Sequence, residues 1–466
     1  MSYEQDFDFS KSFFEQYQKF QRKVPRLTLM NRNAENSEYC NYAGYNKNCY
    51  LIFGGSWYNE DCLYGRRYGY SKSSSDCESL KQGELCYEVL WSANMYECVF
   101  CFDSSTCSNC YFSTNLRGCS NCLFCSELRN KRYYVWNKPV SKTEFENYVR
   151  EMRSFAEFSK MLQQFSKMLE ECIRPWANVV NCTDCIGDYL VNCKNIKYGY
   201  DAIDSEDGKY LVQCESIKDC MDCSSCGYDN PQLFYETVNT GNGGYHNRFC
   251  FSCWNCSELS YCDTVMNSHD CFGCISLNQK QHCVFNKQYS KKEYEELVPR
   301  IIKHMKTTGE FGEFFSISLS PFAYNETIAQ DYFPLIEEAA TGKAFLWESA
   351  EEKNSKHSDS VIPDSIDNVP DSVTSEVLTC TECGKNYKII AQELKLYRHI
   401  GIPIPRKCFS CRQTARTASR NHVWLFERSC AKCGSTMKTG VKSNQINGHS
   451  ASLRVYCEKC YLKAVY

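Results

Sequence analysis

Eight cysteines near the C-terminus have the spacing of metal ligands. They form four CxxC pairs: Cys380 with Cys383, Cys408 with Cys411, Cys430 with Cys433, and Cys457 with Cys460. Each CxxC turn directs two thiolates at one ion, and two such turns complete the tetrahedral four-thiolate shell that Zn²⁺ prefers in structural sites. The sequence therefore predicts two zinc ions per chain as cofactors.

The order of the pairs predicts two zinc modules. A CxxCG turn opens each one, at Cys380 and at Cys430, and a second CxxC pair follows at a similar interval in both. Segments this short cannot fold on apolar burial alone, so the metal would supply folding energy. Another pairing remains open, because the interval between Cys411 and Cys430 is also an acceptable zinc spacing.

Cations and aromatic residues surround these cysteines. Residues 377–466 carry 16 Lys and Arg against 4 Asp and Glu, whereas residues 1–376 carry 37 against 52. The candidate nucleic-acid contacts are Arg398, Arg406, Lys407, Arg412, Arg416 and Arg420, interleaved with Tyr397, Phe409 and Trp424. Cations for phosphates and flat rings for bases favour RNA or DNA binding. The alternative is that the rings form the core of a small domain and the arginines only solvate it.

The sequence carries little sign of enzymatic chemistry. The eight histidines form no recognisable catalytic set, and TGK at 341–343 lacks the upstream glycine of a phosphate-binding loop. A four-thiolate shell is coordinatively closed and leaves no position for an activated water. We therefore expect a protein that is not an enzyme.

The chain before these zinc modules contains two arrays of cysteines that recur with a period of three residues. All ten cysteines between residues 62 and 128 fall on one frame of three, and so do all eleven between residues 190 and 277. A strand alternates with period two and a helix with period 3.6, so neither explains the pattern. It fits a narrow coil of three-residue sides, each with one inward residue. A bundle of polyproline-type helices is the rival, weakened because glycine is too sparse for close packing.

The sequence therefore predicts a mainly β fold with helical additions. Two tandem narrow β-solenoid arrays of about 12 residues per coil would each be followed by helices, and the double zinc-ribbon or treble-clef module would end the chain. The CxxCxxC clusters at 119/122/125, 220/223/226 and 250/253/256 also permit an iron–sulfur interpretation, although none is followed by the further Cys-Pro of ferredoxins. Buried structural thiols are the favoured interpretation.

The two arrays are duplicates of one another. Residues 121–145 align without gaps on 270–294, at a constant offset of 149. Ser141 to Glu144 has the pattern of a capping box, which predicts one helix from there to about Arg174. The expected domains are 1–36, an N-terminal capping helix; 37–178, the first solenoid plus helix; 179–346, the second solenoid plus helices; 347–377, an acidic flexible linker; 378–421, zinc module 1; and 422–466, zinc module 2.

The location of the protein follows from composition. No apolar run is long enough to span a membrane, and the N-terminus lacks the basic and apolar regions of a signal peptide. The 35 cysteines are then expected to be reduced, in the cytoplasm.

Two stretches of sequence carry a family resemblance. The motif CxxCGKxY…PxPRKCxxCR from Cys380, followed by CxxCG…VYCExCY from Cys430, resembles the treble-clef and zinc-ribbon modules of uncharacterised multi-cysteine repeat proteins of bacteria. ENSEYCNYAGYNKNCY and NCLFC…NK, upstream, resemble the same group. The resemblance implies zinc in the tail and assigns no activity.

The sequence is compatible with three functions. The first is a zinc protein that binds RNA or DNA, with ribosomal zinc ribbons as an analogy, through residues 378–466. The second is a protein-interaction scaffold that uses the tyrosine-rich solenoid face. The third is thiol redox chemistry or metal storage by the arrays.

Overall fold

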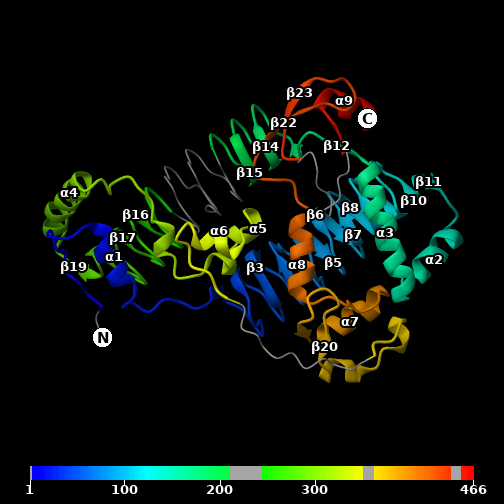
Figure 1. Ribbon diagram of the computed structural model, residues 1–466, viewed down its shortest axis with the longest axis horizontal. Helices are drawn as coiled ribbons and strands as arrows, with labels where there is room; N and C mark the ends of the chain where they lie inside the picture. Colours follow the sequence, from blue (N-terminus) through cyan, green and yellow to red (C-terminus); the bar gives the residue numbers. More distant parts are fainter. Residues whose placement is uncertain (1–2, 210–243, 350–360, 442–452, 466) are drawn as a thin grey trace.

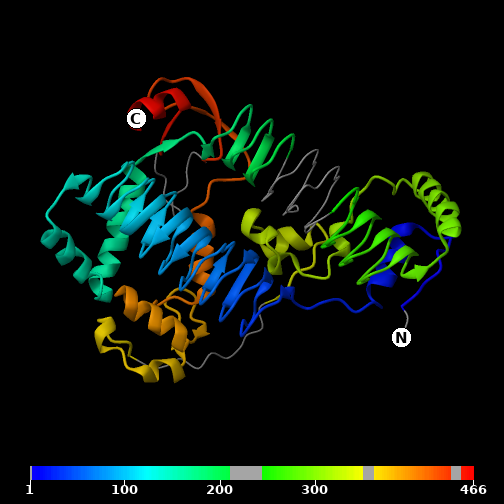
Figure 2. The ribbon, with the colours of Figure 1, turned by 180° about the vertical axis from the view of Figure 1, so that it is seen from behind.

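The computed structural model describes residues 3–209, 244–349, 361–441 and 453–465. In this part of the chain nine α-helices accompany the strands, so the fold is mixed α/β and rich in strands. In Figures 1 and 2 the first array is blue to cyan, the second is green, and the two zinc modules are orange and red.

The first array forms one sheet of eleven strands in sequence order. They are β1 (Asn31–Arg32), β2 (Asn41–Gly44), β3 (Tyr50–Trp57), β4 (Leu63–Arg66), β5 (Glu78–Glu84), β6 (Leu90–Tyr96), β7 (Val99–Phe102), β8 (Ser105–Thr114), β9 (Ser120–Leu123), β10 (Arg132–Val135) and β11 (Lys138–Pro139). The strand pairs are parallel except for the terminal β10–β11 hairpin. In the parallel pairs, partner residues lie 12 or 13 positions apart, so Cys110 stacks beside Cys122.

The three-residue frame separates inward from outward side chains. From residue 62 to residue 125 every residue on the frame is buried. The residue before each of them has positive φ, for example Asp61 at 53° and Asn109 at 50°. A left-handed residue turns the chain sharply, so one such corner in every three residues produces short sides with one inward side chain each. This corner is the physical origin of the period of three.

Hydrogen bonds explain why the inward residue is so often cysteine. The Cys86 thiol donates to the carbonyl of Glu84, two residues before it, at 3.4 Å, and to that of Met95, nine residues after it, at 3.7 Å. Ser92 repeats the pattern with its hydroxyl. A small side chain with one weak donor therefore fits the narrow interior and partners carbonyls there, which is a structural role for the thiols.

The frame shifts by one residue inside β3. Buried inward residues run from Cys40 to Ile52 in steps of three and resume at Ser56. Gly54 and Gly55 lie between them with φ of 69° and 96°, so glycine accommodates the extra residue at this corner.

The described parts of the second array, residues 179–209 and 244–288, contain two short parallel sheets and a closing hairpin. Its strands are β13 (Val179–Val180), β14 (Ile186–Val191), β15 (Lys197–Ile203), β16 (Ser257–Ser260), β17 (His269–Phe272), β18 (Gln281–Val284) and β19 (Lys287–Gln288), and β12 (Ile173–Pro175) precedes them. Paired residues in the parallel sheets lie 11 or 12 positions apart. The cluster at 220/223/226 lies outside the described residues.

The structure reproduces the predicted duplication. Strands β9, β10 and β11 recur as β17, β18 and β19 with both ends displaced by the same offset as the sequence repeat. The helices that follow, α2 (Lys142–Glu151) and α4 (Lys291–Thr307), begin at equivalent positions, and the serine before each one caps it.

An aromatic column on the outer face is duplicated as well. In the first array Phe100, Phe112, Phe124 and Trp136 stack with ring centroids 4.5–5.5 Å apart. The equivalent residues of the second array are Phe249, Tyr261, Gly273 and Phe285.

Phe13 of α1 (Phe13–Gln21) fills the gap at the glycine. It stacks on Phe285 at 5.6 Å, and a Cβ at Gly273 would approach its ring to 3.2 Å. The N-terminal helix therefore packs against the outer face of the second array and does not cap the adjacent first one, which corrects the expected role of residues 1–36. Figure 1 shows α1 beside β17 and α4.

The helix expected from Ser141 to about Arg174 is two helices. The second, α3 (Phe155–Glu171), packs Phe158 and Phe165 against the first aromatic column. The break occurs at Ser154, whose hydroxyl donates to the Asp364 carboxylate at 2.6 Å. A partner far away in the sequence supplies the second helix with its own N-terminal contacts, which local periodicity cannot indicate.

Part of the expected flexible linker is ordered. Residues 361–377 contain the 3-10 helices η3 (Ile366–Asn368) and η4 (Asp371–Ser375). Ile366, Val369 and Val373 are buried in the same cluster as α3. Three apolar residues and ion pairs such as Arg153 with Asp367 dock this acidic segment, which the composition of 347–377 did not indicate.

The remaining elements belong to the connection after α4 and to the zinc modules. They are η1 (Ile317–Leu319), η2 (Tyr324–Glu326), α5 (Ala329–Tyr332), α6 (Glu337–Thr341), β20 (Leu378–Thr379), β21 (Asn386–Tyr387), α7 (Ala391–Ile400), α8 (Phe409–Ala418), β22 (Phe426–Ser429), β23 (Thr436–Thr439), β24 (Arg454–Tyr456) and α9 (Glu458–Val465). Over the described ranges, no helix combines the length and apolar character needed to cross a membrane.

Candidate metal centres and the interface that holds them

Zinc module 1 brings its four predicted ligands together. The turn after β20 supplies Cys380 and Cys383, and the start of α8 supplies Cys408 and Cys411. The sulfur atoms of Cys380 and Cys411 are 3.8 Å apart, and those of Cys383 and Cys408 are 3.7 Å apart. Gly384 ends the turn with φ of 70°, a conformation that favours glycine.

Zinc module 2 repeats the arrangement. Cys430 and Cys433 lie in the turn between β22 and β23, and Cys457 and Cys460 lie at the start of α9. The sulfur atoms of Cys433 and Cys457 are 3.7 Å apart. The alternative pairing of Cys411 with Cys430 is excluded, because the two belong to different clusters.

Both clusters have the dimensions of a metal shell. Zinc–sulfur bonds of about 2.3 Å place the sulfurs of a tetrahedron about 3.8 Å apart. Within each cluster all four sulfurs lie within 4.8 Å of one another. Two groups of four cysteines could therefore hold two metal ions, and thiolate donors in this geometry fit zinc.

Backbone N–H groups stabilise the thiolate form of one cysteine in each cluster. The N–H of Cys408 donates to the sulfur of Cys380 at 3.2 Å, and the N–H of Cys457 donates to that of Cys430 at 3.3 Å. Burial opposes ionisation of Cys380 and Cys430, but these and neighbouring N–H groups outweigh it and lower the pKa of both to about 6.

The array thiols that the structure describes form no comparable cluster. Among the described residues, the two tail groups are the only sets of three or more Cys, His, Asp or Glu whose donor atoms lie close enough together for one ion. The cysteines at 119/122/125 and 250/253/256 are buried on successive sides of their arrays. Nothing in their arrangement supports an iron–sulfur cluster.

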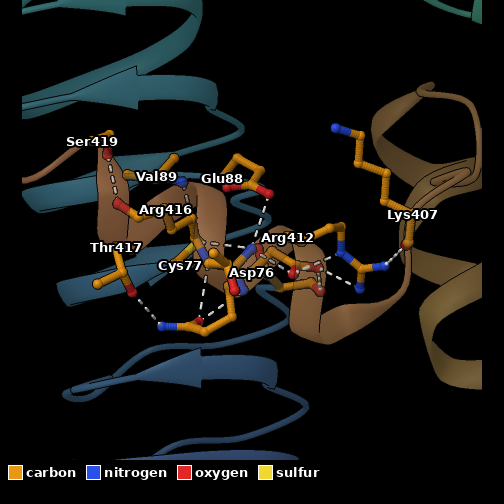
Figure 3. Close-up of polar contacts among 12 residues, drawn as sticks. Asp76, Cys77, Glu88, Val89, Lys407, Arg412, Arg416, Thr417 and Ser419 are labelled. Atoms are coloured by element: carbon orange, nitrogen blue, oxygen red, sulfur yellow. Dashed lines mark hydrogen bonds and ion pairs between the residues drawn. The ribbon is translucent and has the colours of Figure 1, made fainter. Parts of the chain in front are cut away.

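Helix α8 of module 1 inserts two arginines into the acidic side of the first array. Arg412 binds Asp76 through both carboxylate oxygens, at 2.9 and 3.1 Å. Arg416 binds Asp76 at 2.7 Å and Glu88 at 2.9 Å. Figure 3 shows both side chains pointing from the helix toward these carboxylates. All four residues are buried, so each charge depends on its partners.

Arg420 extends the same row beyond the end of α8. Its guanidinium lies 3.1 Å from Glu78 and 3.2 Å from Asp201 of the second array. It also lies over the rings of Trp91, Tyr200 and Tyr332, at 5.2, 5.5 and 4.7 Å.

These contacts correct the predicted nucleic-acid interface. Arg412, Arg416 and Arg420 have almost fully buried side chains and bind carboxylates inside the protein, so their charges are already paired in this arrangement. Arg406 is half-buried and donates to the carbonyls of residues 362 and 363. Lys407 and Arg398 are exposed beside Glu382 and Asp371, respectively. Of the three aromatic residues, Tyr397 is fully buried, Phe409 packs on Tyr64 at 5.4 Å, and Trp424 is 60% exposed.

The carboxylates were missed by the sequence reasoning. Asp76 and Glu88 occupy the same corner position on consecutive repeats of the first array. Arg412, Arg416 and Arg420 recur every four residues, the spacing that places side chains on one face of a helix, although α8 ends at Ala418 before the last of them. Each row has a recognisable spacing, but only the structure shows that they face one another.

Module 2 is attached differently. Strand β24 pairs in parallel with β12, and the Tyr461 hydroxyl of α9 donates to Glu127 at 2.6 Å. Lys432, Lys459 and Lys463 of this module are exposed. Figure 1 shows α9 and β22–β23 at the periphery, above β12 and β14.

A cavity of about 1000 Å³ lies where these parts meet. The first array, α3, the beginning of the second array and both zinc modules contribute to its walls. Its lining includes Trp91, Asp103, Glu127, Leu162, Arg174 and Tyr189.

The chain matches no model of a known protein family, and no curated protein matches it. Among solved structures, the crystal structure of a putative acetyltransferase from Desulfovibrio desulfuricans G20 is similar at 10% identity, over 64% of this chain and 90% of that one, with a TM-score of 0.13. A likeness this weak carries no argument about fold or activity.

Proposed function

We propose that this protein binds RNA or DNA through zinc module 2 and that it is not an enzyme. The observation that carries the proposal is the exposed positive charge of this module, at Lys432, Lys459 and Lys463. Its described residues include six cations, Arg428, Lys432, Lys438, Arg454, Lys459 and Lys463, and two carboxylates, Glu427 and Glu458. Contacts to phosphates supply most of the affinity of a protein for nucleic acid, and these contacts require exposed cations on the protein.

The positions of the charges support this assignment. Lys459 and Lys463 lie one turn apart on α9, and Lys432 lies in the cysteine turn beside the ring of Tyr456. Exposed Trp424 precedes β22 and offers a ring for base stacking. Module 1 would then be the anchor and module 2 the contact surface.

The scaffold and the metal have structural roles in this proposal. Each run of about 12 residues would be one coil of a narrow β-solenoid, with thiols stacked in its interior. Each four-cysteine cluster would hold one Zn²⁺ in a closed, structural shell. The cysteines in the described ranges are all free thiols, which is consistent with a cytoplasmic protein.

A salt titration of the full chain tests the proposal. Binding of a fluorescent single-stranded RNA is measured from about 50 to about 300 mM salt for the wild type and for Lys432→Gln/Lys459→Gln/Lys463→Gln. Three lost phosphate contacts should reduce the slope of log K against log salt by about 2. The control, Lys291→Gln/Lys292→Gln/Lys303→Gln on α4, removes the same charge elsewhere and should keep the wild-type slope. Equal slopes for the two variants, or no binding by the wild type, would contradict the proposal; a DNA strand of the same sequence distinguishes the nucleic acids.

A protein-interaction scaffold is the second candidate. Tyr45, Tyr58 and Tyr70 form an exposed ladder on the first array, with ring centroids 4.8 and 5.0 Å apart. Exposed aromatic rows are typical of protein interfaces. The scaffold predicts partners that remain bound after nuclease treatment and are lost on replacing the three tyrosines by serine.

A further inference from the structure

One polar column of the first array lines the central cavity. Trp91, Asp103, Asn115 and Glu127 occupy the same corner of consecutive repeats, each with positive φ, and all four line the cavity. Side chains at such corners point away from the thiol interior. The column is therefore a row of outward groups enclosed by the zinc modules and α3.

Asp103 differs from the other polar members of this column. Glu127 accepts hydrogen bonds from Tyr461 at 2.6 Å and from Asn115 at 2.8 Å. The Asp103 carboxylate receives none from the described residues. Burial raises the pKa of Asp103 to about 7, and the positive charges of Arg117 and Arg174 offset it only in part. The Asp103 carboxylate can therefore accept hydrogen bonds from a ligand in the cavity.

The rest of the cavity is suited to a flat ring. Phe102 of the array and Leu162 and Leu169 of α3 contribute apolar surface. The Tyr189 ring lies 4.9 Å from that of Trp91 and adds an aromatic edge near Asp103. The volume of about 1000 Å³ accommodates a nucleotide.

We infer that this cavity receives a guanine base, with the Asp103 carboxylate as its acceptor. Guanine presents a ring N–H and an exocyclic amine side by side, which match the two oxygens of one carboxylate. Adenine, cytosine and uracil do not present two adjacent donors on this edge. Recognition of an unstacked base by its hydrogen-bonding edge and by apolar side chains is a general mode of single-strand recognition. The inference rests on the proposed function, which would deliver the strand along module 2.

The test compares guanosine with inosine, whose base lacks the exocyclic amine. Fluorescent oligouridine strands with one central guanosine or inosine are titrated against the full chain. The wild type should bind the guanosine strand about tenfold more tightly, because a carboxylate left with one donor loses roughly one hydrogen bond to a charged group. Asp103→Asn should bind the two strands alike with an unchanged salt slope. Asp184→Asn, an exposed aspartate at a positive-φ corner of the second array, should keep the preference.

Free guanosine monophosphate separates the two sources of the base. If the cavity takes free nucleotides, the monophosphate binds the wild type in calorimetry and Asp103→Asn abolishes the signal. If it takes only strands, the monophosphate is silent while the preference for guanosine persists. Strand binding without that preference, or a preference that survives in Asp103→Asn, overturns the inference and leaves the proposed function standing. Binding of the monophosphate without binding of either strand would contradict the proposed function and leave the inference about the cavity in place.

Discussion

The two zinc modules share a ligand set but use their cations in opposite ways. In module 1, Arg412 and Arg416 are buried against carboxylates of the first array. In module 2, Lys459 and Lys463 are exposed on α9. A buried cation contributes to holding two parts of a protein together, whereas an exposed one is available to an external anion. The positive charge of a zinc module therefore does not by itself indicate a nucleic-acid surface.

The largest difference is expected when each metal site is broken. Cys408→Ser should remove one metal ion per chain and lower the main thermal transition by roughly 10 °C or more, because α8 holds Arg412 and Arg416 against the buried carboxylates of the first array. Cys457→Ser should also remove one metal ion but leave that transition within a few degrees. Metal content by mass spectrometry and calorimetry measure both. Equal shifts would mean that the modules are equally integrated.

The next effect is the loss of one buried cation. Arg416→Met leaves Asp76 and Glu88 without a shared partner and should lower the free energy of unfolding by about 3–5 kcal/mol. Arg398→Met removes an exposed pair with Asp371 and should cost less than about 1 kcal/mol. Urea unfolding measures both. A cost for Arg416→Met as small as that of its control would show that the buried pairs contribute little to the interface.

Acid should weaken the same interface. Burial alone would raise the pKa of Glu78, but Arg66 and Arg420 outweigh it and hold the pKa at about 2. Because this is below the unfolded value, the stabilisation is present above about pH 4.5 and is lost as the pH falls toward 2. Unfolding free energies from pH 5 to pH 3 should therefore fall more steeply for the wild type than for Glu78→Gln. The exposed-site control Glu84→Gln should keep the wild-type slope.

The smallest effect concerns the attachment of module 2. Tyr461→Phe removes the hydroxyl that donates to Glu127 and should cost about 1 kcal/mol. Hydrogen exchange should become faster in α9 and stay unchanged in α8. Tyr456→Phe is the control, and faster exchange in α8 would contradict a separate attachment.

Local spacing predicted what depends on a single segment. The frame of three identified the inward-facing side chains between residues 62 and 125, because one corner per three residues dictates direction along the chain. CxxC spacing likewise identified both four-cysteine clusters, since a turn of four residues brings its two sulfurs to one ion.

Local sequence spacing did not predict the contacts between distant segments. The three arginines of 412–420 have the same periodicity whether they face phosphates or carboxylates, and their partner Asp76 belongs to a repeat near the other end of the chain. The helix break at Ser154 depends on Asp364, and the place of α1 depends on the gap that Gly273 leaves for Phe13. These outcomes require the tertiary partner to be known.

Residue-resolved chemical labelling of the native full chain tests the central claim most directly. An arginine-specific dicarbonyl and a lysine acylating reagent are applied with and without single-stranded RNA, and the sites are read by mass spectrometry. The account predicts that Arg412, Arg416 and Arg420 remain unmodified until the protein is unfolded. It predicts that Lys432, Lys459 and Lys463 react at once and are protected by RNA. Rapid labelling of the three arginines in the native protein, or RNA protection of them in place of the lysines, would contradict it.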